Sequence, residues 1–256
     1  MKYKTVDFSK LSSIKIGPKT KVKLINEENF ENEFLIGRAT NTLISPGASN
    51  LGILDDMYKY IKIKNGYLHV GAKTNNQTFY NFCKKNNIGG FEFLSKLPGT
   101  IGGSVKMNAG VKEYEISDNL LALKTLNGLK EKKEFEFNYR YSDISEPVFE
   151  AVFEIKSGFD YELDETLKKL RSNQPKDPSL GSVFKNPEGD YAGRLIEAVG
   201  MKGMAKGGIK VSEIHANFFV NTGGGTFDDM LFLINEAKKR VYESFSITLE
   251  EEIKII

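Results

Sequence analysis

Residues 61–70 read Ile-Lys-Ile-Lys-Asn-Gly-Tyr-Leu-His-Val. Apolar and charged side chains alternate before the Asn-Gly pair, and an extended pattern resumes after it. Strict alternation predicts a half-buried strand, and Asn-Gly accepts the positive φ angles of a type I′ turn. This stretch therefore predicts a β-hairpin and sets antiparallel strands as the main structure around it.

The remainder of residues 1–155 continues this pattern. Residues 121–126 precede a second Asn-Gly pair, which predicts the same kind of turn, and residues 148–155 alternate again. One helix, over about residues 76–86, is expected to interrupt the strands and to end near Gly89-Gly90. The first part of the chain is thus predicted to be mostly strands.

The last 100 residues are richer in helical periodicity. Apolar stripes predict one helix over residues 163–170, which must end before Pro175, and a second over residues 192–199. A third helix should begin after Thr226, which can cap it, and the basic residues 238–240 suit its C-terminal end, because cations stabilise a helix C-terminus. Its predicted core face comprises Met230, Ile234, Ala237, Val241 and Phe245.

This distribution predicts an α+β fold. The change from strands to helices near Ser157-Gly158 predicts a domain boundary there, so that residues 1–157 form one region and residues 158–256 another. Subdomains of about residues 1–56 and 57–157 are expected within the first region.

Composition excludes several classes of protein. The 36 basic and 34 acidic residues leave a net charge of only +2, which argues against a nucleic-acid-binding protein. No apolar run approaches the ~20 residues of a membrane span. The single cysteine, Cys83, fits a reducing compartment, so a cytoplasmic protein is expected. His69 and His215 stand far apart without cysteine pairs, so no metal site is expected.

Two glycine-rich segments are candidates for binding phosphate groups. Pro98-Gly99-Thr100-Ile101-Gly102-Gly103-Ser104 places three glycines within five residues, and such a loop can turn its amides outward as a nest for pyrophosphate. Its spacing is neither that of a dinucleotide-binding Rossmann turn nor that of a Walker loop, and a tight turn beside a strand remains an alternative. The segment Gly37-Arg38-Ala39-Thr40-Asn41, on its own, fits an ordinary loop at least as well.

Polar residues in three other segments are candidates for chemistry. Ser182, in Gly181-Ser182-Val183-Phe184-Lys185-Asn186-Pro187, has no nucleophile elbow around it, so it would relay a proton or simply form a turn. Ser182 and Phe184 are expected to point one way, and Val183 and Lys185 the other. Arg140, among tyrosines, would stabilise an oxyanion or lie on the surface. In a terminal strand over residues 249–253, Glu250 and Glu252 would share one face.

Taken together and in this order, these segments resemble the UDP-N-acetylenolpyruvoylglucosamine reductase family. The resemblance covers nearly the whole chain and is most specific in residues 98–103, 181–187 and 249–253. Further matching stretches are Asn108-Ala109-Gly110, Tyr139 to Ser142, Gln174-Pro175, Ala192 to Ile196, and Val211-Ser212 with His215 to Phe218.

The resemblance implies a flavoenzyme with FAD bound by residues 1–157, in the fold of the vanillyl-alcohol-oxidase type, and a C-terminal α+β domain that binds substrate. NADPH would reduce the flavin, hydride would pass to C3 of the enolpyruvyl group of UDP-N-acetylglucosamine enolpyruvate, and a proton would pass to C2. Ser182 is implied as the proton donor, and Arg140 and Glu252 as stabilisers of the intermediate. A monomer is expected.

Other residues take binding roles through the same resemblance. The implied substrate-binding residues are Tyr139, Lys185, Asn186 and His215. The implied cofactor-binding residues are Gly37, Arg38, Ala39, Thr40, Asn41, Pro98, Gly99, Thr100, Gly102, Gly103, Ser104 and Asn108.

Three features depart from the usual family pattern. Arg38, Ala39 and Thr40 stand where two glycines and a serine are usual in the first phosphate loop. Only residues 141–181 separate Arg140 from Ser182, so this chain is similar to the shorter members, which lack a loop tyrosine over the substrate. Residues 111–113 replace a small-residue turn, which should affect contacts near the flavin.

Two alternatives remain open from the sequence. One is another FAD-dependent oxidoreductase of the same N-terminal fold, acting on a sugar or an alcohol. The other is a flavin- or sugar-nucleotide-binding protein without turnover.

Overall fold

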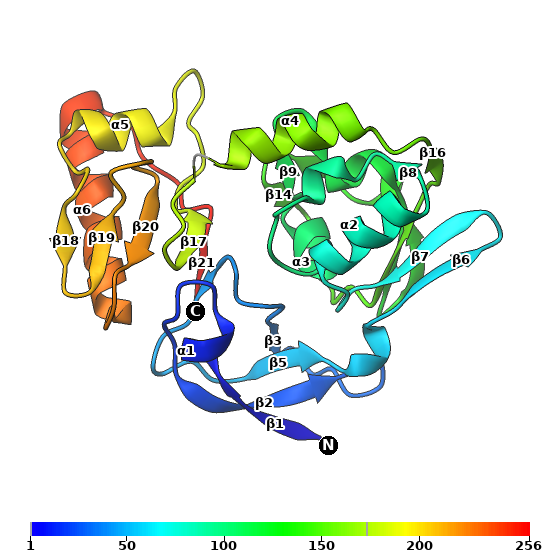
Figure 1. Ribbon diagram of the computed structural model, residues 1–256. Helices are drawn as coiled ribbons and strands as arrows, with labels where there is room; N and C mark the ends of the chain where they lie inside the picture. The colour runs from blue at the N-terminus through cyan, green and yellow to red at the C-terminus, as the bar shows by residue number, and fades with distance from the viewer. Residues whose placement is uncertain (1, 173) are drawn as a thin grey trace. The chain divides into compact units, whose positions relative to one another are not determined.

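The computed structural model describes residues 2–172 and 174–256 and forms two compact units (Figure 1). Unit 1 comprises residues 2–4, Val22–Gly37 and Asn50–Ser172, and unit 2 comprises Thr5–Lys21, Arg38–Ser49 and residues 174–256. These limits differ from the expected ones, because two early segments belong to unit 2 and residues 158–172 belong to unit 1. The chain thus crosses between the units several times.

The helices are short except for the last one. They are α1 (Phe8–Leu11), α2 (Asn76–Lys85), α3 (Ile101–Lys106), α4 (Tyr161–Ser172), α5 (Ala192–Ala198) and α6 (Phe227–Phe245). The 3-10 turns are η1 (Asp56–Tyr58), η2 (Glu92–Leu94), η3 (Ile116–Asn119) and η4 (Lys132–Glu134).

In residues 2–172 and 174–256, the strands form three larger sheets and four two-stranded pairs. The first sheet has the order β1 (Tyr3–Asp7), β2 (Lys19–Ile25), β5 (Leu51–Leu54), β3 (Phe34–Leu35). The second has the order β12 (Gly128–Glu131), β11 (Leu120–Thr125), β15 (Glu150–Phe153), β7 (Tyr67–Gly71), β6 (Ile61–Lys64). The third has the order β17 (Ser179–Ser182), β20 (Phe218–Asn221), β19 (Ile209–Val211), β18 (Ala205–Lys206). The pairs are β9 (Gly110–Val111) with β10 (Tyr114–Glu115), β13 (Phe137–Asn138) with β14 (Tyr141–Ser142), β8 (Ile88–Gly89) with β16 (Lys156–Ser157), and β4 (Thr42–Leu43) with β21 (Lys254–Ile255).

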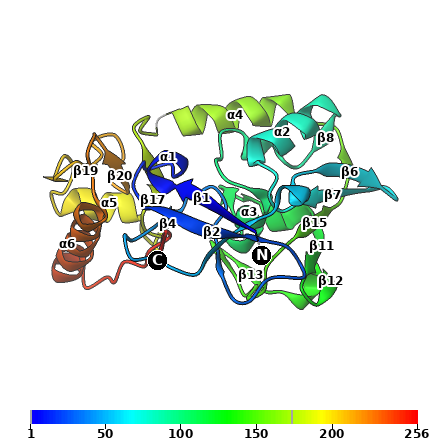
Figure 2. The same cartoon turned by 90° about the horizontal axis from the view of Figure 1, so that it is seen from below.

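The five-stranded antiparallel sheet is the centre of unit 1, and its strands follow one another in Figure 2. The predicted hairpin is confirmed as β6 and β7, with Asn65 at φ 51° and Gly66 at φ 80°, as a type I′ turn requires. The second Asn-Gly pair behaves differently. Thr125 pairs with Gly128 across a turn centred on residues 126–127, so that glycine, at φ 96°, begins β12 instead of forming the turn.

Helix α4 joins unit 1 through a buried carboxylate. Asp164 is fully buried and accepts hydrogen bonds from the Tyr80 hydroxyl at 2.8 Å, from Lys84 at 2.8 Å and from Lys168 at 2.9 Å. Burial raises the pKa of Asp164, but these bonds outweigh it and hold the pKa below its ordinary value. This anchor explains why α4 packs with α2 in unit 1, since Tyr80 and Lys84 belong to α2.

Unit 2 packs α5 and α6 against the β17-β20-β19-β18 sheet around a core that includes Leu195, Phe219 and Leu233. Thr226 caps α6 as predicted, and its side chain and that of Asp229 bond each other's backbone amides. The helix ends at Phe245, the last residue of the predicted apolar stripe. Within its last two turns, Lys238 and Arg240 form ion pairs with Glu251 and Glu236.

The predicted core face of α6 is confirmed for four residues and wrong for the fifth. Met230, Ile234, Ala237 and Val241 are fully buried, whereas Phe245 is 38% exposed. The Phe245 ring lies 5.5 Å from the Arg194 guanidinium, so it serves a surface cation–π contact at the last turn. Among the described residues, no helix combines the length and the apolar character needed to cross a bilayer. The fold as a whole is α+β, as predicted.

Candidate functional site

The segment Pro98–Ser104 folds as a turn that opens α3. Thr100 caps the helix, because its Oγ1 accepts the amide of Gly103 at 3.3 Å and its carbonyl accepts the amide of Ser104 at 2.8 Å. Thr100 itself is 5% exposed. Thr100, which the sequence predicted to bind the cofactor, therefore also stabilises the start of α3.

The prediction that this loop turns its amides outward is wrong for residues 101–104. The amides of Ile101 and Gly102 donate to backbone carbonyls in residues 72–74, at 2.9 Å each. Within the described parts of the chain, the amides of Gly99 and Thr100 make no hydrogen bond. These two N–H groups are the ones that an oxyanion can use in this loop.

The second predicted loop meets the first one at Gly37. A Cβ atom on Gly37 would lie 2.8 Å from Thr100 Oγ1, so only glycine allows this approach within unit 1. The next residues of the loop belong to unit 2. There Ala39 is buried at φ 49°, a left-handed conformation that is unusual for alanine, and Asn41 donates to the Glu252 carbonyl at 3.0 Å.

Arg140 lies at the turn between β13 and β14, with φ 53°. Its side chain is 16% exposed, and its Nη2 donates to the carbonyl of Gly110 at 2.8 Å. The guanidinium lies 5.0 Å from the ring of Tyr139 and 4.0 Å from a carboxylate oxygen of Glu115. Arg140 is therefore a largely buried cation held by a backbone hydrogen bond. Its left-handed backbone is rare for a residue other than glycine, and such conformations cluster at functional sites.

Asn108 connects the predicted cofactor residues to the Arg140 turn. It is fully buried, and its Nδ2 donates to Glu115 at 2.5 Å and to the Asn138 carbonyl at 3.0 Å. Its Oδ1 is buried and has no hydrogen-bond partner among the described residues. A buried acceptor without a partner is costly, and a bound group with an N–H donor would relieve the cost.

Arg171, near the end of α4, is a residue that sequence analysis missed. Burial and the nearby charge of Arg140 lower the pKa of its guanidinium. Its Nε is buried and lacks a hydrogen-bond partner in the described part of unit 1. The positive charges of Arg140 and Arg171 act on each other, so the binding of an anion near them would be favoured. The helical stripe had drawn attention only to the apolar residues of this helix.

Ser182 ends β17, and its backbone stands opposite Phe218 of β20. Gly181, at φ 81°, and an irregular register between Ser179 and Ser182 redirect the chain at this point. The predicted alternation of side chains is wrong beyond Ser182, because Val183 and Phe184 are both buried, at 0% and 1% exposure. The strand ends there, and the chain enters the core of unit 2.

The C-terminal segment runs beside the residues that follow Ser182. Glu252 donates its amide to the Val183 carbonyl at 2.8 Å, and Lys185 donates its amide to the Glu250 carbonyl at 2.9 Å. A single bridge at Glu251 replaces the strand that was expected over residues 249–253, so the segment is irregular. Unit 2 nevertheless brings Glu252 next to the segment that carries Ser182, as the prediction requires.

A pocket of about 450 Å³ in unit 2 is lined by Ser182, Asn186, Tyr191, Gly193, Arg194, Glu197, Ile214, His215, Ala216 and Asn217. It therefore contains the predicted proton donor and two of the predicted substrate-binding residues. Lys185 and Glu252 do not line it, and Lys185 pairs with Glu250 at 2.6 Å. Burial lowers the pKa of His215, and the charge of Lys202 acts in the same direction.

Asn217 is a second residue that sequence analysis left without a role. Its Oδ1 accepts the amide of Phe184 at 3.0 Å, and its Nδ2 donates to the Phe184 carbonyl at 2.8 Å. This reciprocal pair fixes the chain two residues after Ser182. The His-Ala-Asn-Phe motif could have indicated it, because a buried asparagine usually binds backbone groups.

The two units divide the predicted catalytic residues. Arg140 belongs to unit 1, and Ser182 and Glu252 belong to unit 2. Within unit 1, Arg140, Tyr139 and Asn108 form one neighbourhood, and Gly37 and Thr100 form another. The convergence of Arg140 with Ser182 and Glu252 stays a prediction.

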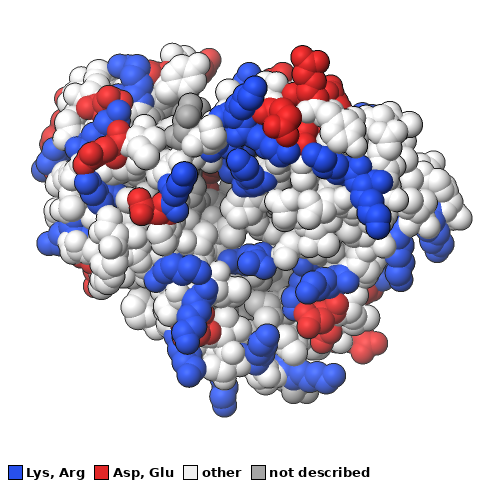
Figure 3. Space-filling model, in the orientation of Figure 1, with Lys and Arg blue, Asp and Glu red and all other residues white. Residues whose placement is uncertain are grey.

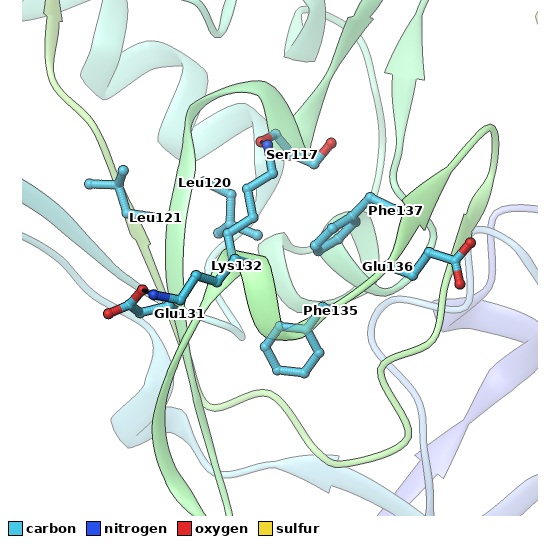
Figure 4. A pocket seen from close by; sticks show the side chains of 9 residues that line it. Ser117, Leu120, Leu121, Glu131, Lys132, Phe135, Glu136 and Phe137 are labelled. Atoms are coloured by element: carbon cyan, nitrogen blue, oxygen red, sulfur yellow. Dashed lines mark hydrogen bonds and ion pairs between the residues drawn. The ribbon is translucent and has the colours of Figure 1, made fainter.

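Unit 1 contains a larger depression, of about 670 Å³. Figure 4 shows the rings of Phe135 and Phe137 and the side chain of Leu120 around it, while the carboxylates of Glu131 and Glu136 point away. It contains no predicted site residue and no group placed for acid–base chemistry. The smaller pocket at Ser182 is the better candidate despite its size.

Charges of both signs are mixed on the face of the molecule that Figure 3 shows. On the face shown in Figure 3, lysine and arginine side chains alternate with acidic and uncharged areas and form no continuous basic tract. Among the residues that the structure describes, no group of three or more His, Cys, Asp or Glu side chains could hold a metal ion. The pocket in unit 2 is lined mainly by hydrogen-bonding groups, and Arg140 supplies a fixed charge within unit 1.

Comparisons with known proteins agree on one family. A family model described as UDP-N-acetylenolpyruvoylglucosamine reductase, C-terminal domain, matches residues 174–256. The UDP-N-acetylenolpyruvoylglucosamine reductase of Campylobacter jejuni (strain RM1221) is 46% identical, covering 98% of this chain and 99% of its own length. That of Helicobacter hepaticus is 43% identical, covering 98% of each chain. Among solved structures, the UDP-N-acetylenolpyruvylglucosamine reductase from Thermus caldophilus has a TM-score of 0.86 at 26% identity, covering 100% of this chain and 99% of its own.

Proposed function

The chain belongs to the family of UDP-N-acetylenolpyruvoylglucosamine reductases, and we infer that it reduces UDP-N-acetylglucosamine enolpyruvate to UDP-N-acetylmuramate with NADPH. It is an oxidoreductase of peptidoglycan precursor synthesis. One hydrogen bond in unit 2 supports these roles most directly: the Glu252 amide donates to the carbonyl of Val183, the residue after Ser182. Two segments distant in sequence are thereby held at one place.

The residues of unit 1 fit a bound FAD, in the fold of the vanillyl-alcohol-oxidase type. The amides of Gly99 and Thr100 and the buried Oδ1 of Asn108 are hydrogen-bonding groups without partners in the described chain, as expected of groups that bind a cofactor. Gly37 keeps the approach to Thr100 open. The proposed FAD contacts also include Arg38, Ala39, Thr40, Asn41, Pro98, Gly102, Gly103 and Ser104.

A bound FAD would supply the redox chemistry, namely hydride transfer from NADPH, with release of NADP⁺, to C3 of the enolpyruvyl group. The electron pair of the C2–C3 double bond then moves toward the carboxylate of the substrate. Arg140 stabilises this developing charge through its fixed fork, and the carboxyl group of Glu252 holds the same carboxylate by a hydrogen bond. Ser182 then gives its proton to C2, which completes the saturated product, and solvent restores the hydroxyl proton.

Substrate binding is assigned to both units. In unit 2, Asn186 and His215 line the pocket with Ser182, and Lys185 lies on the same segment. In unit 1, Tyr139 packs against the Arg140 guanidinium. Arg171 adds a second cation that favours the anionic groups of the substrate near Arg140.

The proposal extends to organisation and location. Residues 1–157 are assigned to FAD binding and residues 158–256 to the substrate, with the last segment returning to the active site. A cytoplasmic monomer is proposed, because a single buried cysteine and a balanced charge give no reason for secretion or for an obligate partner.

The visible spectrum of the purified protein tests the proposal. We expect bands of oxidised flavin that bleach on anaerobic addition of NADPH and return on addition of UDP-N-acetylglucosamine enolpyruvate. A colourless protein that binds no FAD would contradict the cofactor assignment. Flavin that NADPH reduces but the enolpyruvyl sugar nucleotide does not reoxidise would contradict the substrate assignment.

A further inference from the structure

His215 is held in one orientation by contacts on two sides of its ring. Its Nδ1 accepts the backbone amide of Asn217 at 3.2 Å, and its ring centre lies 4.9 Å from that of Phe218. Helix α5 covers the same edge, since a Cβ atom on Gly193 would lie 3.0 Å from His215 Cε1 and 3.4 Å from Nδ1. The imidazole is thus placed by backbone groups while its outer part stays exposed on the wall of the Ser182 pocket.

The bond to Nδ1 decides where the proton sits. A neutral imidazole has one N–H donor and one acceptor, and here Nδ1 is the acceptor. The proton of the neutral ring is therefore on Nε2. Within the described chain, Nε2 makes no hydrogen bond, so this donor is available to a molecule in the pocket.

Other polar groups of the pocket are arranged in the same way. Asn186 Oδ1 accepts the amide of Ala192 at 3.1 Å, which leaves the Asn186 NH₂ as a donor. The Ser182 hydroxyl has no hydrogen bond to the described residues. The pocket thus presents uncharged donors, and those of His215 and Asn186 are oriented by backbone amides that bond the opposite side of each group.

The charged side chains around His215 form ion pairs with one another. Arg194 Nε bonds to Asp190 at 2.7 Å, and Lys202 pairs with Glu197 at 2.8 Å. Glu213, in the segment before the histidine, pairs with Lys210. The pocket therefore favours an uncharged group that is rich in acceptors over a diphosphate.

We propose that His215 acts as a neutral hydrogen-bond donor, whose Nε2–H binds an uncharged oxygen of the sugar-nucleotide substrate and so aligns the substrate beside Ser182. The proposal rests on the function proposed above and adds the protonation state and the ligand chemistry of one residue. The tautomer is set by Asn217, and the ring position is set by the absence of a side chain at Gly193.

Acid should weaken this interaction. Protonation places a second N–H on Nδ1, opposite the Asn217 amide, and two donors cannot share a hydrogen bond. Burial of the inner edge under α5 and the charge of Lys202 lower the pKa of His215, while its own backbone and Glu197 act in the opposite direction. The neutral form is thus favoured, and binding should be lost only as the pH falls below the ordinary histidine value of about 6.5.

Nuclear magnetic resonance of ¹⁵N-labelled histidine tests the tautomer without turnover. The chain has only two histidines, so His215→Asn assigns both sets of signals. We expect His215 in the Nε2–H form, and we expect saturating UDP-N-acetylmuramate to shift its signals and to lower its pKa further, with His69 unchanged. An Nδ1–H tautomer, or His215 signals that do not respond to bound ligand, would overturn the proposal.

Kinetics of His215→Asn test the role in binding. Asparagine retains an acceptor near the Nδ1 position for the Asn217 amide but removes the outer donor. We expect KM for the enolpyruvyl substrate to rise about 3- to 10-fold, the worth of one neutral hydrogen bond, with unchanged flavin reduction by NADPH. The acid limb of kcat/KM that His215 causes should also disappear. His69→Asn is the matched control, because His69 contacts Glu150 in unit 1.

Gly193→Ala moves the ring without changing the histidine. The new methyl group would press on Cε1 and should raise KM to a similar extent, while the melting temperature stays near the wild-type value because alanine suits a helix. Unchanged KM in both variants would reject the proposed role of His215. Failure of the proposed function itself looks different, because the wild-type flavin would then not be reoxidised by the substrate at all.

Discussion

Arg140 and Ser182 are assigned to the same reaction, yet their local surroundings are opposite. Arg140 is mostly buried, has a left-handed backbone, and is bonded to the Gly110 carbonyl at 2.8 Å. Ser182 lies at the end of a strand on the wall of a pocket, and its hydroxyl has no partner among the described residues. One group is fixed before any ligand arrives, and the other is left for the ligand to orient.

The difference follows from what each group must do. A cation that stabilises developing charge works best when it is already in place, because no reorganisation is then needed during the reaction. A proton donor must instead reach the carbon that receives the proton, so its hydrogen bonds in the resting protein are better left unmade. The contrast predicts that variants of the two residues differ in the size of their effect on flavin reoxidation.

Ser182→Ala should have the largest effect. Loss of the proton donor should slow reoxidation of the flavin by the enolpyruvyl substrate ~10²-fold or more, about 3 kcal/mol of barrier. Reduction of the flavin by NADPH should stay near the wild-type rate, as measured by anaerobic stopped-flow absorbance. The matched control is Ser179→Ala in the same strand, which should leave both rates within about 2-fold. Equal slowing of both half-reactions in Ser182→Ala would reject the role.

Arg140→Lys should follow with a loss of about 10- to 100-fold in the same half-reaction, because one fixed electrostatic donor is commonly worth ~10²-fold. Lysine keeps the charge but lacks the planar fork that binds both Gly110 and a ligand. Arg240→Lys, at a surface ion pair of α6, is the control. Wild-type turnover in Arg140→Lys would remove this residue from the site.

Glu115→Gln should have a smaller effect. The Glu115 carboxylate lies 4.0 Å from Arg140 and accepts from Asn108, so its charge holds the arginine side chain from behind. Without that charge we expect turnover to fall about 2- to 5-fold, on the scale of a partly exposed ion pair. Steady-state kcat measures the effect. A loss as large as that of Arg140→Lys would show that Glu115 acts on the substrate directly.

Ala39→Gly should have the smallest effect. Ala39, like Arg140, has a left-handed backbone, with φ 49°. Its side chain is buried, with 2% exposure. Glycine relieves about 1 kcal/mol of backbone strain and loses a buried methyl group worth about 0.8 kcal/mol, so the free energy of unfolding should change by less than about 1 kcal/mol. Urea denaturation measures it. A change above about 2 kcal/mol would mean that the loop is held differently.

Much of the fold could be predicted from the sequence because its signals are local. The Asn65-Gly66 turn and the Thr226 cap depend on residues close together in sequence, and both are confirmed. The exposure of Phe245 was not predicted, because its contact with Arg194 joins residues that are far apart in the sequence. The position of α4 depends on Asp164, a charged residue that a search for apolar stripes overlooks.

In the candidate site, too, local patterns in the sequence did not show the contacts between residues that are far apart in the chain. Motifs identified Ser182, Asn186 and His215, which line one pocket, and Glu252, whose amide bonds beside Ser182. They did not identify Glu115 or Arg171, because both act through contacts with residues far away in the sequence. The outward amides predicted for residues 101–104 are instead bonded to the backbone, a competition that a glycine count cannot reveal.

A double-mutant cycle on flavin reoxidation tests most directly whether the fixed cation of unit 1 and the free hydroxyl of unit 2 act on one substrate. The rate of reoxidation by UDP-N-acetylglucosamine enolpyruvate is measured for wild type, Ser182→Ala, Arg140→Lys and the double variant. We predict that the double variant is slowed clearly less than the product of the single effects, as for residues that act as a unit. Two effects that simply multiply would contradict this account and would separate the residues into independent sites.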